Sequence, residues 1–372
     1  MNVCLYNVTT TTQYGGVESF VWEVARGLAQ RGVRTTIVGG DGNIRRAHDH
    51  VRVVTFPFTS RETLRKLPGF AKQYTLTKLL ERLHFAQHAR AFMQREQFDI
   101  IHIQKPYDLP AAAWFKRNSK SKIVFGCHGT DFFPFDTRFV HTSDIAVSCS
   151  AFNANQVREH YGITPRVVYN GIDPAQFFPQ TPDANLRKQI AGDAQTILYA
   201  GRLVRWKGVQ YLIDAVALLA KTRNVQLLIA GEGEYRATLE QRARALGISE
   251  RINYLGYISS DALAPYYALA DVVALASYAN ETFSIMSAEA MACARPVVGS
   301  RFGGIPEVIA DGETGFLAEP ENANDFAEKI ARLLDDADLR ERFGNCGRER
   351  VLKMFTWDAV TERVLEAYRE IL

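Results

Sequence analysis

The chain has 372 residues, of which 47% are hydrophobic and 23% charged, and its formal net charge at pH 7 is +3. This length exceeds what one ordinary hydrophobic core supports and predicts two domains. The small net charge argues against a nucleic-acid partner, and the sequence holds no run of about 18 apolar residues that could span a membrane.

The first half of the chain alternates strand-like and helix-like segments. Helical periodicity separates most of the expected strands, for example over residues 17–32, where Gly32 is expected to end the helix. Several strands are nearly continuous apolar runs, as parallel strands covered on both faces are. Repeated winding of this kind predicts an α/β domain with a parallel sheet. The expected strands are residues 2–8, 34–40, 51–56, 99–104, 122–128, 144–150 and 166–171.

The same pattern restarts in the second half. Residues 170–185 carry three prolines and are the best candidate for a linker. Two Rossmann-like domains are therefore expected to face one another across a cleft. Residues 355–372 form the pattern of a final amphipathic helix. The strands expected here are residues 196–203, 225–233, 251–257, 271–277, 296–300 and 315–319.

Residues just after strands are the candidates for a site, because ligands of doubly wound sheets bind beyond the carboxyl ends of the strands. YGGVES (14–19) opens the first helix, where Gly15 and Gly16 would let an anion approach the helix N-terminus. A tight turn explains the same glycines. His128, in CHGTD (127–131), ends the fifth strand and can hydrogen-bond a sugar hydroxyl or share a proton. The alternative is a turn histidine that the backbone satisfies.

Two basic residues follow the first strand of the second half, in AGRLVRWKG (200–208). Arg202 offers a planar guanidinium and Lys207 a point charge, and together they suit a diphosphate. Arg205, in the same loop, has solvation as its simpler explanation. The glycine-rich AGEGEY (230–235) could place backbone amides on a nucleotide, and a plain turn accounts for it equally well.

Two glutamates stand eight positions apart in ANETFSIMSAEAMA (279–292). On one continuous helix they would diverge by about 80°, so Glu281 is expected in a loop and Glu289 inside the helix that follows. A carboxylate among apolar neighbours needs a partner, which indicates a functional role. The alternative is a pair of solvated side chains.

The DDAD segment (335–338) has a spacing that can hold a divalent metal. It lies between two helical segments and far from the strand ends. A turn between helices is therefore expected there, and no metal site is predicted.

Together these segments resemble glycosyltransferase family 4, whose members are retaining enzymes of the GT-B fold. The resemblance covers nearly the whole chain, and its specificity comes from motifs in the family's order. They are GGVE (15–18), HGTD (128–131), NGID (170–173), GRLVRWKG (201–208), GEG (231–233), ETFSIMSAEAMA (281–292), GGIPE (303–307) and TGFLA (314–318). The resemblance implies an acceptor-side domain of residues 1–172 and 356–372, on which the final helix packs. Residues 173–355 would then form the nucleotide-sugar domain.

The resemblance also implies roles for individual residues. Glu281 would contact the donor sugar near the reacting carbon and Glu289 the ribose hydroxyls. His128 would contact the transferred sugar, and Arg202 and Lys207 the diphosphate. Glu281, His128, Arg202 and Lys207 are therefore the predicted catalytic residues. The predicted substrate contacts are Gly15, Gly16, Asp131, Asn170, Gly201, Gly231, Gly233, Thr282, Phe283, Ser284, Ile285 and Glu289.

One loop departs from the family pattern. The family commonly has glycines where Thr282 and Ser284 stand, and two side chains there are expected to narrow the loop beside the sugar. This leaves the identity of the donor open, although not the type of reaction.

The implied reaction moves a sugar from a UDP- or GDP-linked donor to a glycan, a lipid-linked or a small-molecule acceptor, with no cofactor and no metal. Breaking the sugar–phosphate bond leaves negative charge on the phosphate, which fixed cations stabilise. A nucleotide-sugar epimerase or hydrolase and a non-catalytic sugar-nucleotide binding protein are the alternatives. A dehydrogenase is not favoured, because the GxGxxG fingerprint is missing.

Two further features bear on the location of the protein. Residues 61–95 hold eight Lys/Arg and two Glu, with Leu, Phe and Tyr between them. Such a stretch can lie on an anionic membrane or form the solvated face of a helix. The five cysteines are scattered, which suits reduced thiols in the cytoplasm. The expected location is therefore cytoplasmic, with the inner face of the cell membrane as the place of a peripheral association.

Overall fold

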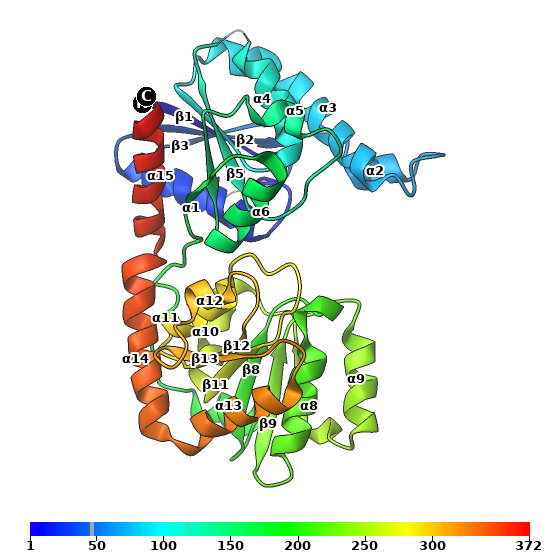
Figure 1. The fold of residues 1–372 in the computed structure, drawn as a ribbon, viewed down its shortest axis with the longest axis vertical. Helices are drawn as coiled ribbons and strands as arrows, with labels where there is room; N and C mark the ends of the chain where they lie inside the picture. The colour runs from blue at the N-terminus through cyan, green and yellow to red at the C-terminus, as the bar shows by residue number, and fades with distance from the viewer. Residues whose placement is uncertain (45–47, 118) are drawn as a thin grey trace. The chain divides into compact units, whose positions relative to one another are not determined.

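The computed structural model describes residues 1–44, 48–117 and 119–372 (Figure 1). The chain divides into two compact units. Unit 1 comprises Met1–Gly171 and Trp357–Leu372, and unit 2 comprises Ile172–Thr356. Within the described residues, every strand expected from the sequence is present, most of them shorter than predicted.

The sheet of unit 1 has the strand order β3-β2-β1-β4-β5-β6-β7, and its neighbouring strands run parallel. Winding starts at β1, runs outward to β3 and returns to the other side of β1 with β4. The strand order thus reverses between β1 and β4, where doubly wound sheets bind their ligands. The strands are β1 Asn2–Tyr6, β2 Arg34–Gly40, β3 Val51–Phe56, β4 Ile100–Ile103, β5 Lys122–Cys127, β6 Ile145–Ser148 and β7 Arg166–Val167.

Helices cover both faces of this sheet. Val3 and Leu5 of β1 belong to one hydrophobic core, whereas Cys4 and Tyr6 belong to another. Because successive side chains of a strand point to opposite faces, two cores explain why the strand is a continuous apolar run. The helices of unit 1 are α1 Gly16–Gln30, α2 Arg61–Arg65, α3 Tyr74–Arg95, η1 Pro106–Asp108, α4 Leu109–Lys116, α5 Thr137–Val140, α6 Ala151–Tyr161 and α15 Trp357–Ile371.

The last helix, α15, completes the hydrophobic core on the α1 side. Val364 and Tyr368 are fully buried in that core, and Arg31 at the end of α1 pairs with Asp358 at 2.6 Å. The Tyr368 hydroxyl also lies 2.7 Å from Nδ1 of His102, a buried residue of β4. The prediction that the final helix packs on the first domain is therefore confirmed.

Unit 2 repeats the same winding. Its sheet has the strand order β10-β9-β8-β11-β12-β13, and its neighbouring strands are parallel. Here the order reverses between β8 and β11. The strands are β8 Gln195–Ala200, β9 Val225–Ala230, β10 Ile252–Gly256, β11 Val272–Leu275, β12 Val297–Ser300 and β13 Gly315–Ala318. The helices are α7 Ala184–Ile190, η2 Arg205–Lys207, α8 Val209–Leu219, α9 Arg236–Ala245, η3 Ser249–Arg251, α10 Ser260–Leu269, α11 Ile285–Ala292, α12 Ile305–Val308, α13 Ala323–Asp335 and α14 Ala337–Met354.

The DDAD segment is the turn between α13 and α14, as the sequence predicts. Asp336 caps α14, because its carboxylate accepts a hydrogen bond from the Leu339 amide at 2.8 Å. Asp335 pairs with Arg223 at 2.6 Å. These carboxylates therefore have structural partners.

Candidate active site

The carboxyl ends of β8 and β11 define the candidate site of unit 2. These strands are neighbours, and the strand order reverses between them. The basic segment 201–207 follows β8, and segment 277–284, which contains Glu281, follows β11. Because the carboxyl ends of parallel strands meet at one edge, the topology brings the two segments together.

An ion pair joins the two segments. The ammonium of Lys207 lies 2.6 Å from Oε2 of Glu281, and the Ser277 hydroxyl donates to the same oxygen at 2.9 Å. Glu281 is only 9% exposed, so two donors hold its carboxylate in a largely desolvated position. Both contacts use Oε2, and no described residue hydrogen-bonds Oε1. The geometry brings together Lys207 and Glu281, which the sequence predicts for one site.

Both predicted cations of the loop lie over the ring of Trp206. The Lys207 ammonium is 4.8 Å and the Arg202 guanidinium 5.8 Å from the ring centroid. The indole therefore helps to hold two positive charges near one another. Arg202 is exposed, and its guanidinium forms no hydrogen bond or ion pair with a described residue. Arg205 is also exposed, which agrees with the solvated interpretation.

Glu289 lies inside α11, and Glu281 precedes that helix in a loop, as the sequence predicts. The Tyr267 hydroxyl, from α10, donates to Oε2 of Glu289 at 2.8 Å. Burial raises the pKa of Glu289 to about 7, and the tyrosine hydrogen bond acts in the opposite direction. A buried carboxylate that titrates near neutrality is typical of a functional site.

The loop from Glu281 to α11 is fixed by its own packing. Phe283 is buried, Thr282 is partly exposed, and Ile285 is the first residue of the helix. Ser284 caps the helix, because its hydroxyl accepts a hydrogen bond from the backbone amide three residues later at 3.3 Å. Its φ of 119° lies in the region that favours glycine. This backbone conformation explains why glycine is common at the equivalent place in the family that the sequence resembles.

Two glycines support this loop from the side of β12. The Gly304 amide donates to the carbonyl oxygen of Glu281 at 2.9 Å. A Cβ atom at Gly303 would lie 2.1 Å from that oxygen, and one at Gly304 would lie 2.2 Å from the carbonyl oxygen of Thr282. Neither glycine is among the site residues predicted from the sequence, although the GGIPE motif that contains them could have indicated their role.

Packing alone accounts for the glycines after β8 and β9. A Cβ atom at Gly231 would lie 1.9 Å from the carbonyl oxygen of Gly201, and one at Gly233 would lie 2.2 Å from that of Leu203. The two loops therefore touch through their backbones. This contact supports the plain-turn interpretation, and a nucleotide contact for Gly201, Gly231 and Gly233 stays a prediction.

His128 is the predicted catalytic residue of unit 1. It follows β5, and its Nε2 lies 3.0 Å from Oε1 of Gln104. Since that oxygen can only accept, Nε2 of His128 donates. The ring packs edge-on against Phe20, with centroids 4.7 Å apart. Burial, followed by the charge of Lys105, lowers the pKa of His128 well below its ordinary value, so the imidazole is neutral at pH 7.

The other residues predicted in unit 1 lie in different settings. Gly15 and Gly16 are exposed where α1 begins. Asp131 pairs with Lys78 of α3. Asn170 is 7% exposed, and its Oδ1 is buried without a hydrogen bond from any described residue.

Several supporting residues were not predicted from the sequence. Ser277 and Tyr267 hold the two glutamates, and Trp206 lies beneath the two cations. Ser277 and Lys105 both follow strands closely and could have been found by that signal. Tyr267, in contrast, comes from the middle of a helix and has no such signal.

Two absences concern only the part of the chain that the structure describes. No group of three or more His, Cys, Asp or Glu side chains there is arranged to hold a metal ion. Nor does any helix there combine the length and the apolar character that crossing a bilayer requires.

Family models match both halves of the chain. The model described as Glycosyltransferase Family 4 matches residues 14–176, and the model described as Glycosyl transferases group 1 matches residues 183–350. These two matches together cover most of both units.

Similar proteins agree with these matches. The chain is 30% identical over an alignment of 302 residues to an uncharacterized glycosyltransferase of Methanocaldococcus jannaschii, and the match covers 74% of this chain and 76% of that protein. It is 30% identical over 299 residues to N-acetyl-alpha-D-glucosaminyl L-malate synthase of Bacillus anthracis, covering 75% and 76% of the two chains. Among solved structures, Anabaena HepE in complex with UDP has a TM-score of 0.81 at 21% identity, with all of both chains covered. These names favour a transferase over an epimerase or a binding protein.

Proposed function

The chain belongs to glycosyltransferase family 4 and has the GT-B fold, and on this premise we propose that it is a retaining, metal-independent enzyme with a nucleotide-diphosphate sugar as donor. Unit 2 would bind this donor and unit 1 the acceptor, which is a glycan, a lipid-linked or a small molecule. The observation that carries the proposal is the Lys207–Glu281 ion pair, with Arg202 beside it, where the strand order of unit 2 reverses.

The two cations would stabilise the leaving group. When the bond between sugar and diphosphate breaks, negative charge grows on the phosphate oxygens, and fixed positive charges lower the energy of that state. Lys207 is already held by Glu281 and Trp206, so little reorganisation is needed. Arg202 has no anionic partner among the described residues and can pair its guanidinium with a phosphate.

Glu281 would act on the sugar side of the same bond. Positive charge grows on the anomeric carbon as the bond breaks, and a nearby carboxylate stabilises it. Since Lys207 and Ser277 both contact Oε2, Oε1 is the oxygen left to face the sugar. Retention would follow if the acceptor attacks from the side of the leaving phosphate and gives it its proton.

Glu289 would hold the ribose of the donor. Its Oε2 accepts the Tyr267 hydroxyl, and Oε1 has no described partner. A carboxylate can accept hydrogen bonds from sugar hydroxyls on its remaining oxygen. In unit 1, the neutral His128 would contact the transferred sugar.

The donor and the acceptor are open to direct identification. The Anabaena structure contains UDP, so UDP-sugars are the first donors to test and GDP-sugars the second. The name of the Bacillus anthracis relative describes an N-acetylglucosaminyl group joined to L-malate, which makes small molecules worth testing beside glycans and lipid-linked acceptors.

The proposed reaction is tested by its products. UDP-, GDP- and ADP-sugars are first screened by thermal shift, because a ligand that binds only the folded state stabilises it by about 2.7 kcal/mol at one hundred times its Kd. The donor that binds is then incubated with acceptor pools in excess EDTA. We expect a glycoside whose anomeric configuration, measured by NMR, matches that of the donor. An isomerised donor, an inverted glycoside or activity that EDTA abolishes would contradict the proposal.

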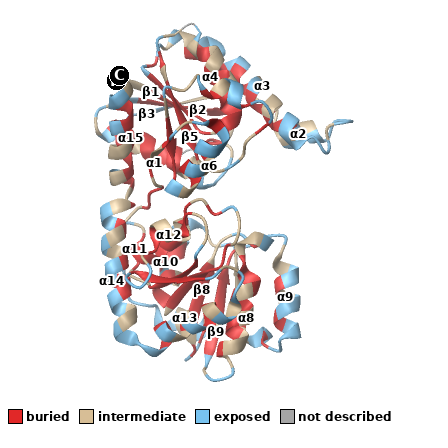
Figure 2. Cartoon of the chain, viewed as in Figure 1, coloured by how far each residue is buried: buried red, intermediate tan, exposed pale blue. Residues whose placement is uncertain are grey.

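We also propose that one segment of unit 1 contacts an anionic membrane surface. The structure corrects the extent of this segment, because Lys78 and Arg82 of the basic stretch 61–95 are buried. The segment before them, residues 61–76 and called here the α2 arm, holds the exposed Arg65, Lys66 and Lys72, whereas the exposed Arg90 and Arg95 lie farther along α3. Leu67, Tyr74 and Leu76 are exposed in the same arm, and Figure 2 shows it standing clear of the sheet and its core.

Vesicle sedimentation tests the α2 arm. Each basic residue near an anionic surface contributes about 1 kcal/mol, so replacing Arg65, Lys66 and Lys72 by Gln should weaken binding to phosphatidylglycerol vesicles roughly 100-fold. A control variant makes the same change of charge at three exposed positions of unit 1 outside the basic stretch: Arg34, Arg117 and Lys120. The membrane proposal fails if both variants bind equally, or if the unmodified protein binds no vesicles at low salt.

A further inference from the structure

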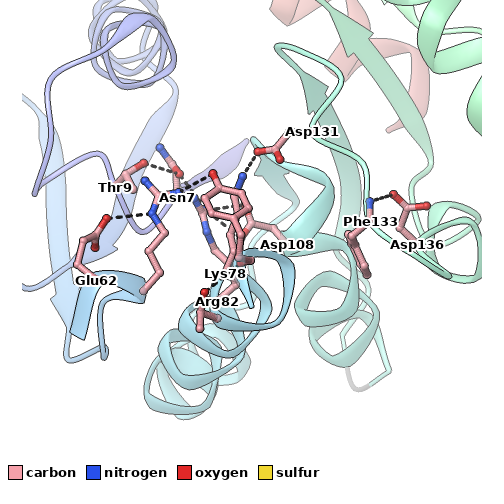
Figure 3. Close-up of polar contacts among 12 residues, drawn as sticks. Asn7, Thr9, Glu62, Lys78, Arg82, Asp108, Asp131, Phe133 and Asp136 are labelled. Carbon is pink, nitrogen blue, oxygen red and sulfur yellow. Dashed lines mark hydrogen bonds and ion pairs between the residues drawn. The ribbon is translucent and has the colours of Figure 1, made fainter. Parts of the chain in front are cut away.

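The strand order of unit 1 also reverses, between β1 and β4. The polar side chains at the carboxyl ends of these two strands take no part in the donor chemistry proposed above. Asn7 directly follows β1, and Lys105 and Asp108 follow β4. Helix α3 brings Lys78 and Arg82 to the same place, as Figure 3 shows. Ligands of doubly wound sheets bind at such a reversal, so these polar side chains stand where a ligand of unit 1 is expected.

One cation of this cluster is neutralised by the protein itself. Arg82 lies 3.0 Å from Oδ2 of Asp108 and 3.1 Å from Oδ1 of Asn7. The two charged side chains of this pair are almost completely buried. Each charge of this buried pair needs the other as its partner, so the side chains of Arg82 and Asp108 are held in place at the buried side of the cluster.

A second cation has a partner that is partly open to solvent. Lys78 pairs with Asp131, whose side chain is 37% exposed, and its ammonium lies 4.5 Å from the centroid of the Tyr107 ring. Burial, followed by the charges of Lys105 and Arg82, lowers the pKa of Lys78 to about 7. The positive charges of Lys105 and Arg82 thus disfavour the protonated form of Lys78.

Lys105 differs from both, because no described residue lies within hydrogen-bond or ion-pair distance of its ammonium. Its side chain is only partly exposed. Burial and then the charge of Arg82 lower its pKa, while Glu18 and Asp108 favour its charge from beyond contact distance. A largely desolvated cation without a counter-ion is costly, and an anionic ligand would remove that cost.

Resting on the proposed function, we infer that this edge of unit 1 binds an acidic group of the acceptor, a phosphate monoester or a carboxylate, through Lys105 and Lys78. Lys105 supplies the unmatched charge, and Lys78 supplies a second donor from α3. Lys105 follows β4, and His128, the residue predicted to contact the transferred sugar, follows the neighbouring parallel strand β5. An acidic group on Lys105 would therefore place the acceptor close to that histidine.

Binding of simple anions tests this inference without any sugar transfer. Inorganic phosphate and succinate are titrated against potassium chloride of equal ionic strength, and the melting temperature is followed. The full-length Arg202→Ala/Lys207→Ala protein serves as the background, because the diphosphate site of unit 2 would otherwise bind phosphate too. We expect one or both anions to raise the melting temperature of this background protein. Adding Lys105→Met should weaken that binding roughly ten- to a hundredfold, as expected for a lost hydrogen bond to a charged group.

A matched control is Lys120→Met, which removes an exposed lysine of unit 1 and should leave the anion response unchanged. Without added anions, Lys105→Met should melt no lower than its parent, because it removes an unpaired charge. A response to phosphate alone assigns a phosphate monoester, and a response to succinate alone assigns a carboxylate. No response in the background protein, or a response that Lys105→Met leaves intact, would overturn the inference. A failure of the proposed sugar transfer is distinguished from these outcomes, because it would be seen in the product assay and not in the anion titration.

Discussion

Replacing Arg202 or Lys207 by Ala is expected to lower kcat by roughly 100- to 1,000-fold, the usual loss when one fixed electrostatic stabiliser of a transition state is removed. Both charges lie over Trp206 at the carboxyl end of β8. Because their stabilisation grows as the phosphate departs, the loss should fall on kcat more than on donor binding. Steady-state kinetics with the donor identified by the thermal-shift screen measures the effect.

The same loop provides the control for this experiment. Arg205 carries the same charge as Arg202, is exposed and lies over no aromatic ring among the described residues. Arg205→Ala should therefore keep kcat within about twofold, because Arg205, unlike Arg202, is not held over the Trp206 ring beside Lys207. Lys207→Ala also leaves the carboxylate of Glu281 with the Ser277 hydroxyl as its one described hydrogen-bond partner, so its loss should exceed that of Arg202→Ala. Normal turnover in both alanine variants would remove the proposed site.

Glu289→Gln is expected to make the protein more stable and its donor binding weaker. The folded protein raises the pKa of Glu289 from 4.5 to about 7, so the folded state holds this proton more tightly than the unfolded state does. The stability from this residue is thus fully present below pH 4.5 and is lost as the pH rises through about 7. This shift in the pKa corresponds to on the order of 3 kcal/mol of folding stability. Glu289→Gln should therefore unfold with a higher free energy than the unmodified protein at pH 8, and with no such gain at pH 4.5.

Donor binding should change in the opposite direction. The ionised carboxylate is the better acceptor for ribose hydroxyls, so UDP affinity in the unmodified protein should rise as the pH increases through about 7. Glu289→Gln should lose roughly ten- to a hundredfold in affinity at pH 8, as expected for a lost hydrogen bond to a charged group, and should lose the pH dependence. Calorimetric titration and thermal unfolding over the same pH range give both quantities.

Tyr267→Phe is the matched control for the Glu289 prediction. The tyrosine hydroxyl lowers the pKa of Glu289, so its removal should move the midpoint of UDP binding to higher pH while the carboxylate stays in place. An unchanged stability of Glu289→Gln at pH 8, together with unchanged UDP affinity, would contradict both roles of Glu289.

The strands and the edge of the sheet that carries the candidate site could be predicted from the sequence because their signals are local. A parallel strand buried on both faces is a nearly continuous apolar run, as β1 is after Asn2 and β4 is apart from His102. The residues that follow such strands, including Arg202 and Lys207, are then placed by topology alone. Glu281 could be assigned to a loop and Glu289 to a helix from their spacing.

The side chains that pair with the charged residues could not be predicted, because these contacts depend on which faces of distant helices pack together. Lys78 and Arg82 belong to a stretch whose charge is typical of a surface, yet α3 buries both of them against the strand ends. Likewise, nothing in the sequence around Tyr267 indicates that its hydroxyl reaches Glu289. Contacts of this kind are set by packing between distant segments rather than by any local pattern.

The place of α15 in unit 1 has a consequence for how the protein is made. Unit 2 is one uninterrupted segment, whereas unit 1 needs residues from both ends of the chain. During synthesis on the ribosome, unit 2 can therefore fold as soon as it has emerged. The apolar face of α1 that Val364 and Tyr368 cover stays open until residues 357–371 leave the exit tunnel. A nascent chain that stalls near residue 356 would thus present a finished second half and a first half that chaperones must still protect.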